Sequence, residues 1–154
     1  MASFVNAADV IAAAVEIERR GHKFYENAAR EAATPEAREF FEFMAKEELK
    51  HERIFESMQK RVGTPDLPFD VSNKEYLSYL EASLDSHMLF SEDQSIADKD
   101  PYRAAISFEK DTIVYFLAML ELVPESEKEH VIQCIAEEKG HMVLINDKRK
   151  AAGK

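Results

Sequence analysis

Residues 44–58, MAKEELKHERIFESM, decide the fold of this chain. Apolar side chains such as Phe55 and Met58 recur there at helical spacing, so the stretch predicts one face of an amphipathic helix. Two positions on that face are not apolar, because Glu48 and His51 stand three residues apart where a bundle core is expected. An acid and an imidazole on a core-facing stripe indicate a site as well as a fold.

The composition of the whole chain favours long helices. Its 154 residues include four glycines and five prolines, too few for a turn-rich sandwich or barrel. The apolar share of 45% is enough for one core at this length, and the longest apolar run, residues 113–120, is far shorter than the roughly 20 residues of a membrane span. A formal net charge of −10 argues against a nucleic-acid or anionic-membrane partner. We therefore predict a single domain over residues 1–154.

The few helix breakers divide the chain into segments. Thr34-Pro35 and Asp100-Pro101 each indicate an N-cap followed by proline at the first helical position, and Pro124 marks another boundary. The segments between these boundaries carry apolar residues at helical spacing. They predict long helices at about 6–33, 35–62, 101–122 and 125–150.

The stretch from residue 63 to residue 100 is too long for a tight turn between antiparallel neighbours. Leu77, Leu80 and Leu84 recur there at helical spacing, which predicts a crossover helix at about 72–92. Such a crossover lets the second and third long helices run parallel. The predicted fold is all-α, a four-helix bundle with a long helical crossover between the second and third long helices.

Every long helix carries a carboxylate on its apolar face, and two of them also carry a histidine. The stripes place six polar side chains in the core: Glu18, Glu48, His51, Glu109, Glu138 and His141. Burying four carboxylates costs several kcal/mol per ion without compensation, and the core-facing positions hold no Lys or Arg. A bound metal is the simplest compensating charge, and carboxylates with imidazoles suit iron, manganese or zinc.

Spacing along the helices predicts that these side chains lie at one height. Glu18 precedes the N-cap of the second helix by 16 residues and Glu48 follows it by 14, so both lie about 24 and 21 Å from the same turn at about 1.5 Å per residue. In the second half, Glu109 and Glu138 lie 15 and 14 residues from Pro124. The two halves therefore repeat one pattern, a glutamate followed by Glu-x-x-His.

The doubled pattern resembles the di-iron carboxylate proteins of the ferritin-like superfamily. Residues 18–25, ERRGHKFY, and 47–51, EELKH, are most similar to the rubrerythrin-type di-iron domain. The resemblance covers about residues 10–62 and 100–148. It implies a ferritin-like fold and two iron ions per chain, with zinc or manganese as the alternative metals.

The resemblance also implies roles for individual residues. Glu48 and Glu138 match bridging carboxylates, and the terminal ligands would be Glu18, Glu109, His51 and His141. Tyr25 matches a tyrosine that hydrogen-bonds a ligand carboxylate from one turn away. Glu47 and Glu137 adjoin the proposed bridging residues and are the alternative ligands, although the three-residue spacing to histidine favours Glu48 and Glu138.

The activity implied by the resemblance is that of a non-haem di-iron oxidoreductase, of peroxidase or ferroxidase type, that reacts with oxygen or hydrogen peroxide. Cys134 is the only cysteine, so the chain has no Cys-x-x-Cys pair for a rubredoxin-type site, and we expect an external electron donor. A single cysteine and no visible secretory signal favour the cytoplasm. We also expect a homodimer. Ferritin-like iron storage, a di-iron monooxygenase and a purely structural bundle are the alternatives.

Four further positions depart from the pattern or lack a role in it. Thr112 stands where rubrerythrins carry a second glutamate, which calls into question their redox-linked exchange of iron ligands and efficient peroxide reduction. Gly21 and Gly140 lie inside helices beside the proposed ligands, and we interpret both as points of close helix approach. His87 has no partner pattern and is interpreted as structural.

Overall fold

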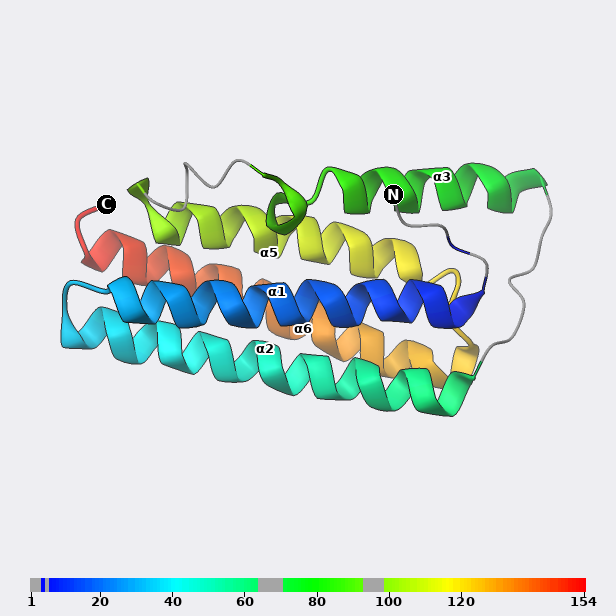
Figure 1. The fold of residues 1–154 in the computed structure, drawn as a ribbon, viewed down its shortest axis with the longest axis horizontal. Coiled ribbons are helices and arrows are strands. Elements are labelled where there is room, and N and C mark those ends of the chain that lie inside the picture. Colours follow the sequence, from blue (N-terminus) through cyan, green and yellow to red (C-terminus); the bar gives the residue numbers. More distant parts are fainter. Residues whose placement is uncertain (1–3, 5, 64–70, 93–98) are drawn as a thin grey trace.

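Long helices running along one axis build the structure (Figure 1). The computed structural model describes residues 4, 6–63, 71–92 and 99–154. Within these residues the elements are α1 (Ala7–Glu31), α2 (Pro35–Val62), α3 (Val71–Asp85), the 3-10 helix η1 (Met88–Phe90), α5 (Pro101–Met119) and α6 (Glu125–Ala151). None of the helices in the described part of the chain has the length and apolar character needed to cross a membrane.

Capping side chains begin α1, α2 and α5, whereas Pro124 precedes α6. Thr34 accepts a hydrogen bond from the backbone N–H three residues later at 3.2 Å, and Asp100 does the same at 3.2 Å. Proline follows each of them at the first helical position, as the sequence predicts. Helix α1 begins with a capping box in which Asn6 and Asp9 each accept the other's backbone N–H at 3.0 Å.

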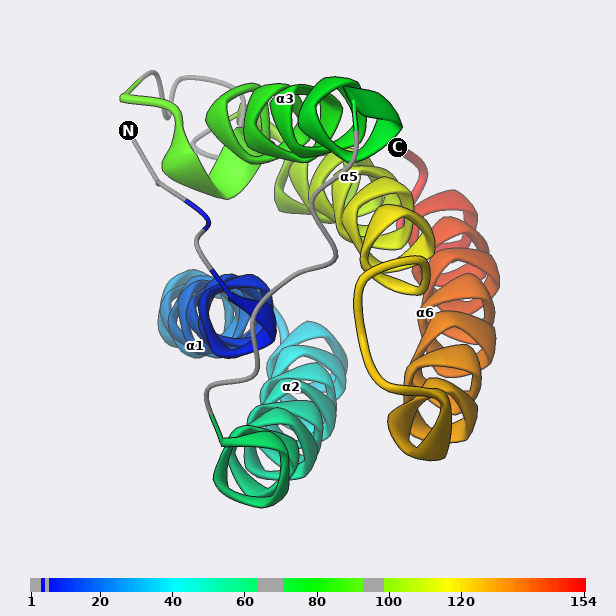
Figure 2. The same ribbon diagram turned by 90° about the vertical axis from the view of Figure 1, so that its right-hand side faces the viewer.

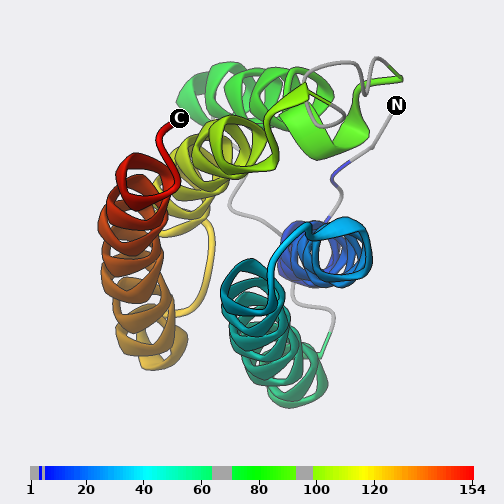
Figure 3. The ribbon, with the colours of Figure 1, turned by 90° about the vertical axis from the view of Figure 1, so that its left-hand side faces the viewer.

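The helices form an all-α four-helix bundle, which confirms the predicted fold. Viewed along the bundle, α1 and α2 make one antiparallel pair, and α5 and α6 make the other (Figure 2). The opposite end shows the short connection between α1 and α2 on the near side (Figure 3). Helix α3 runs along the outer side of α5 and brings the chain back to the end of the bundle where α2 begins, so α2 and α5 run parallel (Figure 1).

The crossover differs from its prediction in one respect. The continuous helix expected at 72–92 ends at Asp85 and is followed by the separate turn η1. Between them the backbone of His87 is extended, with φ −64° and ψ 131°, and its ring Nδ1 accepts the N–H of Leu89 at 3.2 Å. The histidine thus ends α3 and caps η1, because a side chain that accepts this bond competes with helix continuation.

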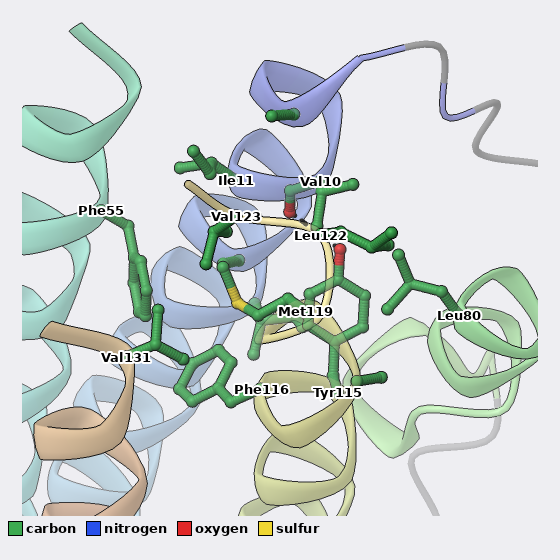
Figure 4. Packing of buried hydrophobic residues seen from close by; sticks show 14 of the residues in the cluster. Val10, Ile11, Phe55, Leu80, Tyr115, Phe116, Met119, Leu122, Val123 and Val131 are labelled. Atoms are coloured by element: carbon green, nitrogen blue, oxygen red, sulfur yellow. Dashed lines mark hydrogen bonds between the residues drawn. The ribbon is translucent and has the colours of Figure 1, made fainter. Parts of the chain in front are cut away.

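Two apolar clusters fill the bundle on either side of a polar layer. This layer consists of the side chains of Glu18, Glu48, His51, Glu109, Glu138 and His141. The first lies at the end that contains the start of α1, and its residues include Val10, Phe55, Phe116 and Met119 (Figure 4). The second lies at the opposite end and is rich in aromatic rings. Its main members are Tyr25, Phe40, Phe41, Met44, Tyr102 and Phe108. Each long helix contributes to both clusters and crosses the polar layer between them.

Candidate metal centre

Helix periodicity turns the polar side chains of the layer inward. On α2, Glu48 follows Met44 by four residues and precedes Phe55 by seven, and both neighbours are fully buried. Positions three, four and seven apart share one helix face, so Glu48 points between the two apolar clusters. The same spacing turns the polar side chains of α1, α5 and α6 toward the inside of the bundle. All six side chains predicted from the sequence are buried: Glu18, His51, Glu109 and Glu138 at 0% exposure, Glu48 at 1% and His141 at 6%.

The six side chains gather into two overlapping groups. Glu18 and His51 belong to the first group, and Glu109 and His141 belong to the second. Both groups also contain Glu48 and Glu138, and in each group one possible ligand atom per residue lies within 4.8 Å of every other. Two carboxylates shared between two sets of donors is the arrangement expected for a pair of metal ions with two bridging ligands. The structure therefore brings together all six predicted ligands.

The two histidines present equivalent atoms to the shared carboxylates. Nδ1 of His51 donates to Oε1 of Glu138 at 2.7 Å, and Nδ1 of His141 lies 2.7 Å from Oε2 of the same residue. The inner nitrogen of His51 is also 3.6 Å from Oε2 of Glu18. That of His141 is 3.9 Å from Oε1 of Glu109. Both Nδ1 atoms thus face the centre of the layer.

Several carboxylate oxygens in the layer are buried without a hydrogen-bond partner among the described residues. These are both oxygens of Glu18, Oε1 of Glu48 and Oε2 of Glu109. In the same part of the chain, the ion pairs of Lys and Arg all involve other carboxylates. Unpaired buried carboxylate oxygens are unfavourable unless a cation binds them. The donor set therefore fits two divalent ions, whose four positive charges balance four carboxylates.

The pKa values of the layer reflect burial without a cation. Burial, followed by the charge of Glu138, raises the pKa of Glu18 to about 7. The same two causes raise the pKa values of Glu48 and Glu109 well above the usual range. Burial would also raise the pKa of Glu138, but hydrogen bonds from both histidines outweigh it and lower the pKa to about 2. Three of the four carboxyl groups thus favour their protonated forms until a cation binds.

Tyr25 reaches the layer from the aromatic cluster. Its hydroxyl donates to Oε1 of Glu109 at 2.6 Å, and the ring is fully buried. Phe24 and Phe108 pack edge-on against it, with centroids 5.4 and 5.2 Å away. The structure therefore places Tyr25 where it can orient one carboxylate, which is the kind of contact that the resemblance implies.

The two glutamates that the sequence left as alternative ligands lie behind the histidines. Oε2 of Glu137 is 2.8 Å from the outer nitrogen, Nε2, of His51, and Oε2 of Glu47 is 3.7 Å from Nε2 of His141. Both side chains are about one quarter exposed, at 25% and 24%. Lys50 bridges the two carboxylates on the surface, at 3.1 and 3.6 Å. Glu137 thus hydrogen-bonds the histidine of the opposite half and Glu47 lies near the other histidine, a pairing that no spacing within one helix could have predicted.

The two glycines beside the layer have different surroundings. A Cβ atom added to Gly21 would collide with Oε2 of Glu48, so this glycine makes room for a shared carboxylate. A Cβ atom added to Gly140 would meet nothing within 4 Å. The interpretation of Gly140 as a point of close approach is therefore wrong, because the residue lies on the exposed side of α6.

His87 and Thr112 form a contact that sequence reasoning missed. His87 has 0% exposure, Thr112 has 1%, and Nε2 of the histidine lies 3.0 Å from Oγ1 of the threonine. The sequence contained no signal for it, because 25 residues separate the pair and one partner lies in the crossover. Thr112 follows Glu109 by one turn on the stripe that faces the bundle interior.

Comparisons with known proteins concern the family and the fold of the chain. Residues 9–147 match the family model described as Rubrerythrin. Among solved structures, the chain is similar to a ferritin-like diiron-carboxylate protein from Thermotoga maritima, with a TM-score of 0.68, 21% identity and 96% of each chain covered. At that identity the likeness shows the fold alone. The search of curated proteins found no match.

Proposed function

This chain belongs to the rubrerythrin family, and we propose that it is a di-iron carboxylate protein that reacts with oxygen or hydrogen peroxide. The observation that carries the proposal is the pair of buried donor groups that share Glu48 and Glu138. A structural bundle has no need for four buried carboxylates, three of which have oxygens without a hydrogen-bond partner among the described residues, whereas a pair of iron ions requires such ligands. The electrons would come from an external donor, because Cys134 is the only cysteine of the chain.

Each half of the bundle supplies ligands to both ions. Glu18 and His51 would hold one ion, Glu109 and His141 would hold the other, and the two shared glutamates would lie between them. Two ferrous ions bound there would supply the two electrons that, with two protons, reduce oxygen to peroxide or peroxide to water. All six side chains come from the middle of long helices, so the rigid bundle sets their positions.

Surrounding residues orient these ligands. Tyr25 holds one oxygen of Glu109 at 2.6 Å and leaves the other oxygen free for a metal. Behind His51, the carboxylate of Glu137 accepts a bond from Nε2 at 2.8 Å, which leaves Nδ1 as the ligand atom. The flanking apolar clusters exclude water from both ends of the layer.

Iron binding by a variant of the two shared glutamates tests the proposal. The double variant Glu48→Ala/Glu138→Ala is expected to lose the metal pair, whereas the unaltered protein should bind about two ferrous ions per chain under anaerobic conditions. Glu42→Ala/Glu129→Ala removes two exposed glutamates from the same helices and is the matched control. Iron content after gel filtration gives the stoichiometry, and the rate of ferrous oxidation by oxygen or peroxide gives the activity.

Two results would contradict the proposal. One is a stoichiometry below one transition metal per chain in the unaltered protein after anaerobic loading. The other is an unchanged iron stoichiometry in the Glu48→Ala/Glu138→Ala variant, which would place the metal elsewhere.

A further inference from the structure

The segment between α3 and α5 carries a buried histidine that contacts α5. His87 precedes η1, and its Nε2 atom lies 3.0 Å from Oγ1 of Thr112 on α5. The N–H of the following residue donates to Asp111, also on α5, at 2.9 Å. Arg20 on α1 donates to a carbonyl of η1 at 3.1 Å. Contacts with both helices therefore fix the backbone around His87 against the bundle.

The hydrogen bonds of the ring determine which nitrogen carries its proton. Nδ1 of His87 is 3.2 Å from the backbone N–H of Leu89, and a backbone N–H can only donate. Nδ1 must therefore accept, so the proton of the neutral ring lies on Nε2. Burial, followed by the charge of Arg20, lowers the pKa of His87 to about 4, which keeps the ring neutral near pH 7. His87 consequently donates to Thr112.

This bond leaves the hydroxyl of Thr112 with a hydrogen to donate. Serine and threonine on helices often donate to the carbonyl four residues earlier, as Ser78 and Ser83 do on α3. Among the described residues, Thr112 makes no such bond and has His87 as its hydrogen-bond partner. Thr112 is 1% exposed and follows Glu109 by one helical turn. Oε2 of Glu109 has no hydrogen-bond partner among the described residues.

The residue three positions after the first glutamate differs between the two halves of the bundle. It follows Glu109 by three residues, and the equivalent residue after Glu18 is Gly21. Gly21 makes room for the carboxylate of Glu48. Thr112 instead carries a buried hydroxyl that bonds to His87. The two halves therefore differ at the position one turn after the first glutamate.

We propose that His87 holds Thr112 so that its hydroxyl donates a hydrogen bond to a small anion that enters the metal pair beside Glu109. This assignment rests on the proposed function. The ligand class is an anion of two or three atoms with an acceptor atom, such as hydroperoxide, and azide is the probe for it. Thr112 is then a binding residue, and His87 is a positioning residue that acts through it.

Azide titration of the iron-loaded, oxidised protein tests the role of Thr112, with azide-to-iron absorption as the readout. Thr112→Val keeps the shape of the side chain but loses the donor, so we expect the Kd for azide to rise about tenfold. Thr112→Ser keeps the hydroxyl and should stay within about twofold of the unaltered protein. His87→Phe should also raise the Kd. Ser107→Ala removes a hydroxyl from another side of α5 and should leave the Kd unchanged.

Iron content separates the two proposals. An unaltered protein that binds less than one transition metal per chain after anaerobic loading overturns the proposed function and this assignment together. Full iron content in Thr112→Val with an unchanged Kd for azide overturns this assignment alone.

The tautomer of His87 gives a second test that needs neither metal nor variant. Nitrogen chemical shifts of the histidines in the metal-free protein should show the proton of His87 on Nε2. A proton on Nδ1 would remove the donor to Thr112 and overturn the assignment, even if the valine variant fails to fold.

Discussion

Single residues decide how closely the helices can approach the metal centre. Gly21 lies so near the carboxylate of Glu48 that any side chain would displace it, whereas Gly140 lies in open space on α6. Gly21 follows Glu18 by three residues and shares its inward face, whereas Gly140 follows Glu138 by two residues and lies on another face of its helix. Their difference arises from which side of the helix faces the bundle.

Alanine substitutions at the two glycines should therefore affect different properties, iron binding for Gly21 and stability for Gly140. Gly21→Ala displaces Glu48 and is expected to weaken iron binding about 10- to 100-fold, as for other changes that disturb the support of a metal ligand. Gly140→Ala meets no neighbour and should raise the free energy of unfolding by roughly 0.5–1 kcal/mol, because alanine favours a helix. Iron titration and urea denaturation measure the two effects. Equal iron affinities in the two variants would contradict the assigned role of Gly21.

At the scale of elements, all four long helices place polar side chains at the boundary between the two apolar clusters. The N-caps set where each helix begins and hence where its carboxylate lies along the bundle. The crossover has another task. Helix α3 covers α5, and the interruption at His87 directs one ring toward Thr112.

The N-cap of α2 offers a test at this scale. Thr34→Ala removes the acceptor for the N–H three residues later, so we expect the free energy of unfolding to fall by about 1 kcal/mol. Arg38→Ala, an exposed change in the same first turns, is the control and should have a smaller effect. Urea denaturation followed by circular dichroism gives both values. A loss no larger than that of the control would show that the cap does not stabilise α2.

At the scale of the whole molecule, the polar layer makes stability depend on metal and on pH. The pKa of Glu18 is raised from 4.5 to about 7 in the folded, metal-free protein, and those of Glu48 and Glu109 are also raised well above the usual range. Folded chains then bind more protons than unfolded chains above about pH 4.5, so stability falls as pH rises. Hydrogen bonds with carboxylates outweigh the burial of His51 and raise its pKa, which adds to the same trend above pH 6.5.

The melting temperature of the metal-free protein should consequently fall by several degrees between about pH 5 and pH 7.5. Metal loading should raise the melting temperature most at the upper end, because bound cations favour ionised carboxylates. Glu18→Gln removes one of the responsible groups and should reduce the slope. Thermal denaturation at several pH values, with and without ferrous iron under anaerobic conditions, measures these effects. A melting temperature that rises over this range without metal would contradict the explanation.

Much of the fold and of the candidate site could be predicted from the sequence, since both depend on spacing along helices. Proline and N-cap residues marked the starts of α2 and α5, and residues three or four apart identified Glu48 with His51 as one face. The extent of the crossover helix could not be predicted, because His87 ends α3 through its own hydrogen bond. Its link to Thr112 and the pairing of Glu137 with His51 join distant segments, which helical spacing does not relate.

The sequence by itself determined that four helices carry four carboxylates and two histidines into a core at matched heights. Helix periodicity is local, and 3.6 residues per turn is enough to assign side chains to a face. Only the tertiary structure decided how the halves face each other. It shows that Glu48 and Glu138 are shared and that each outer glutamate lies behind the histidine of the opposite half. It also shows how closely Gly21 approaches the carboxylate of Glu48, because distances between helices depend on packing of the whole chain.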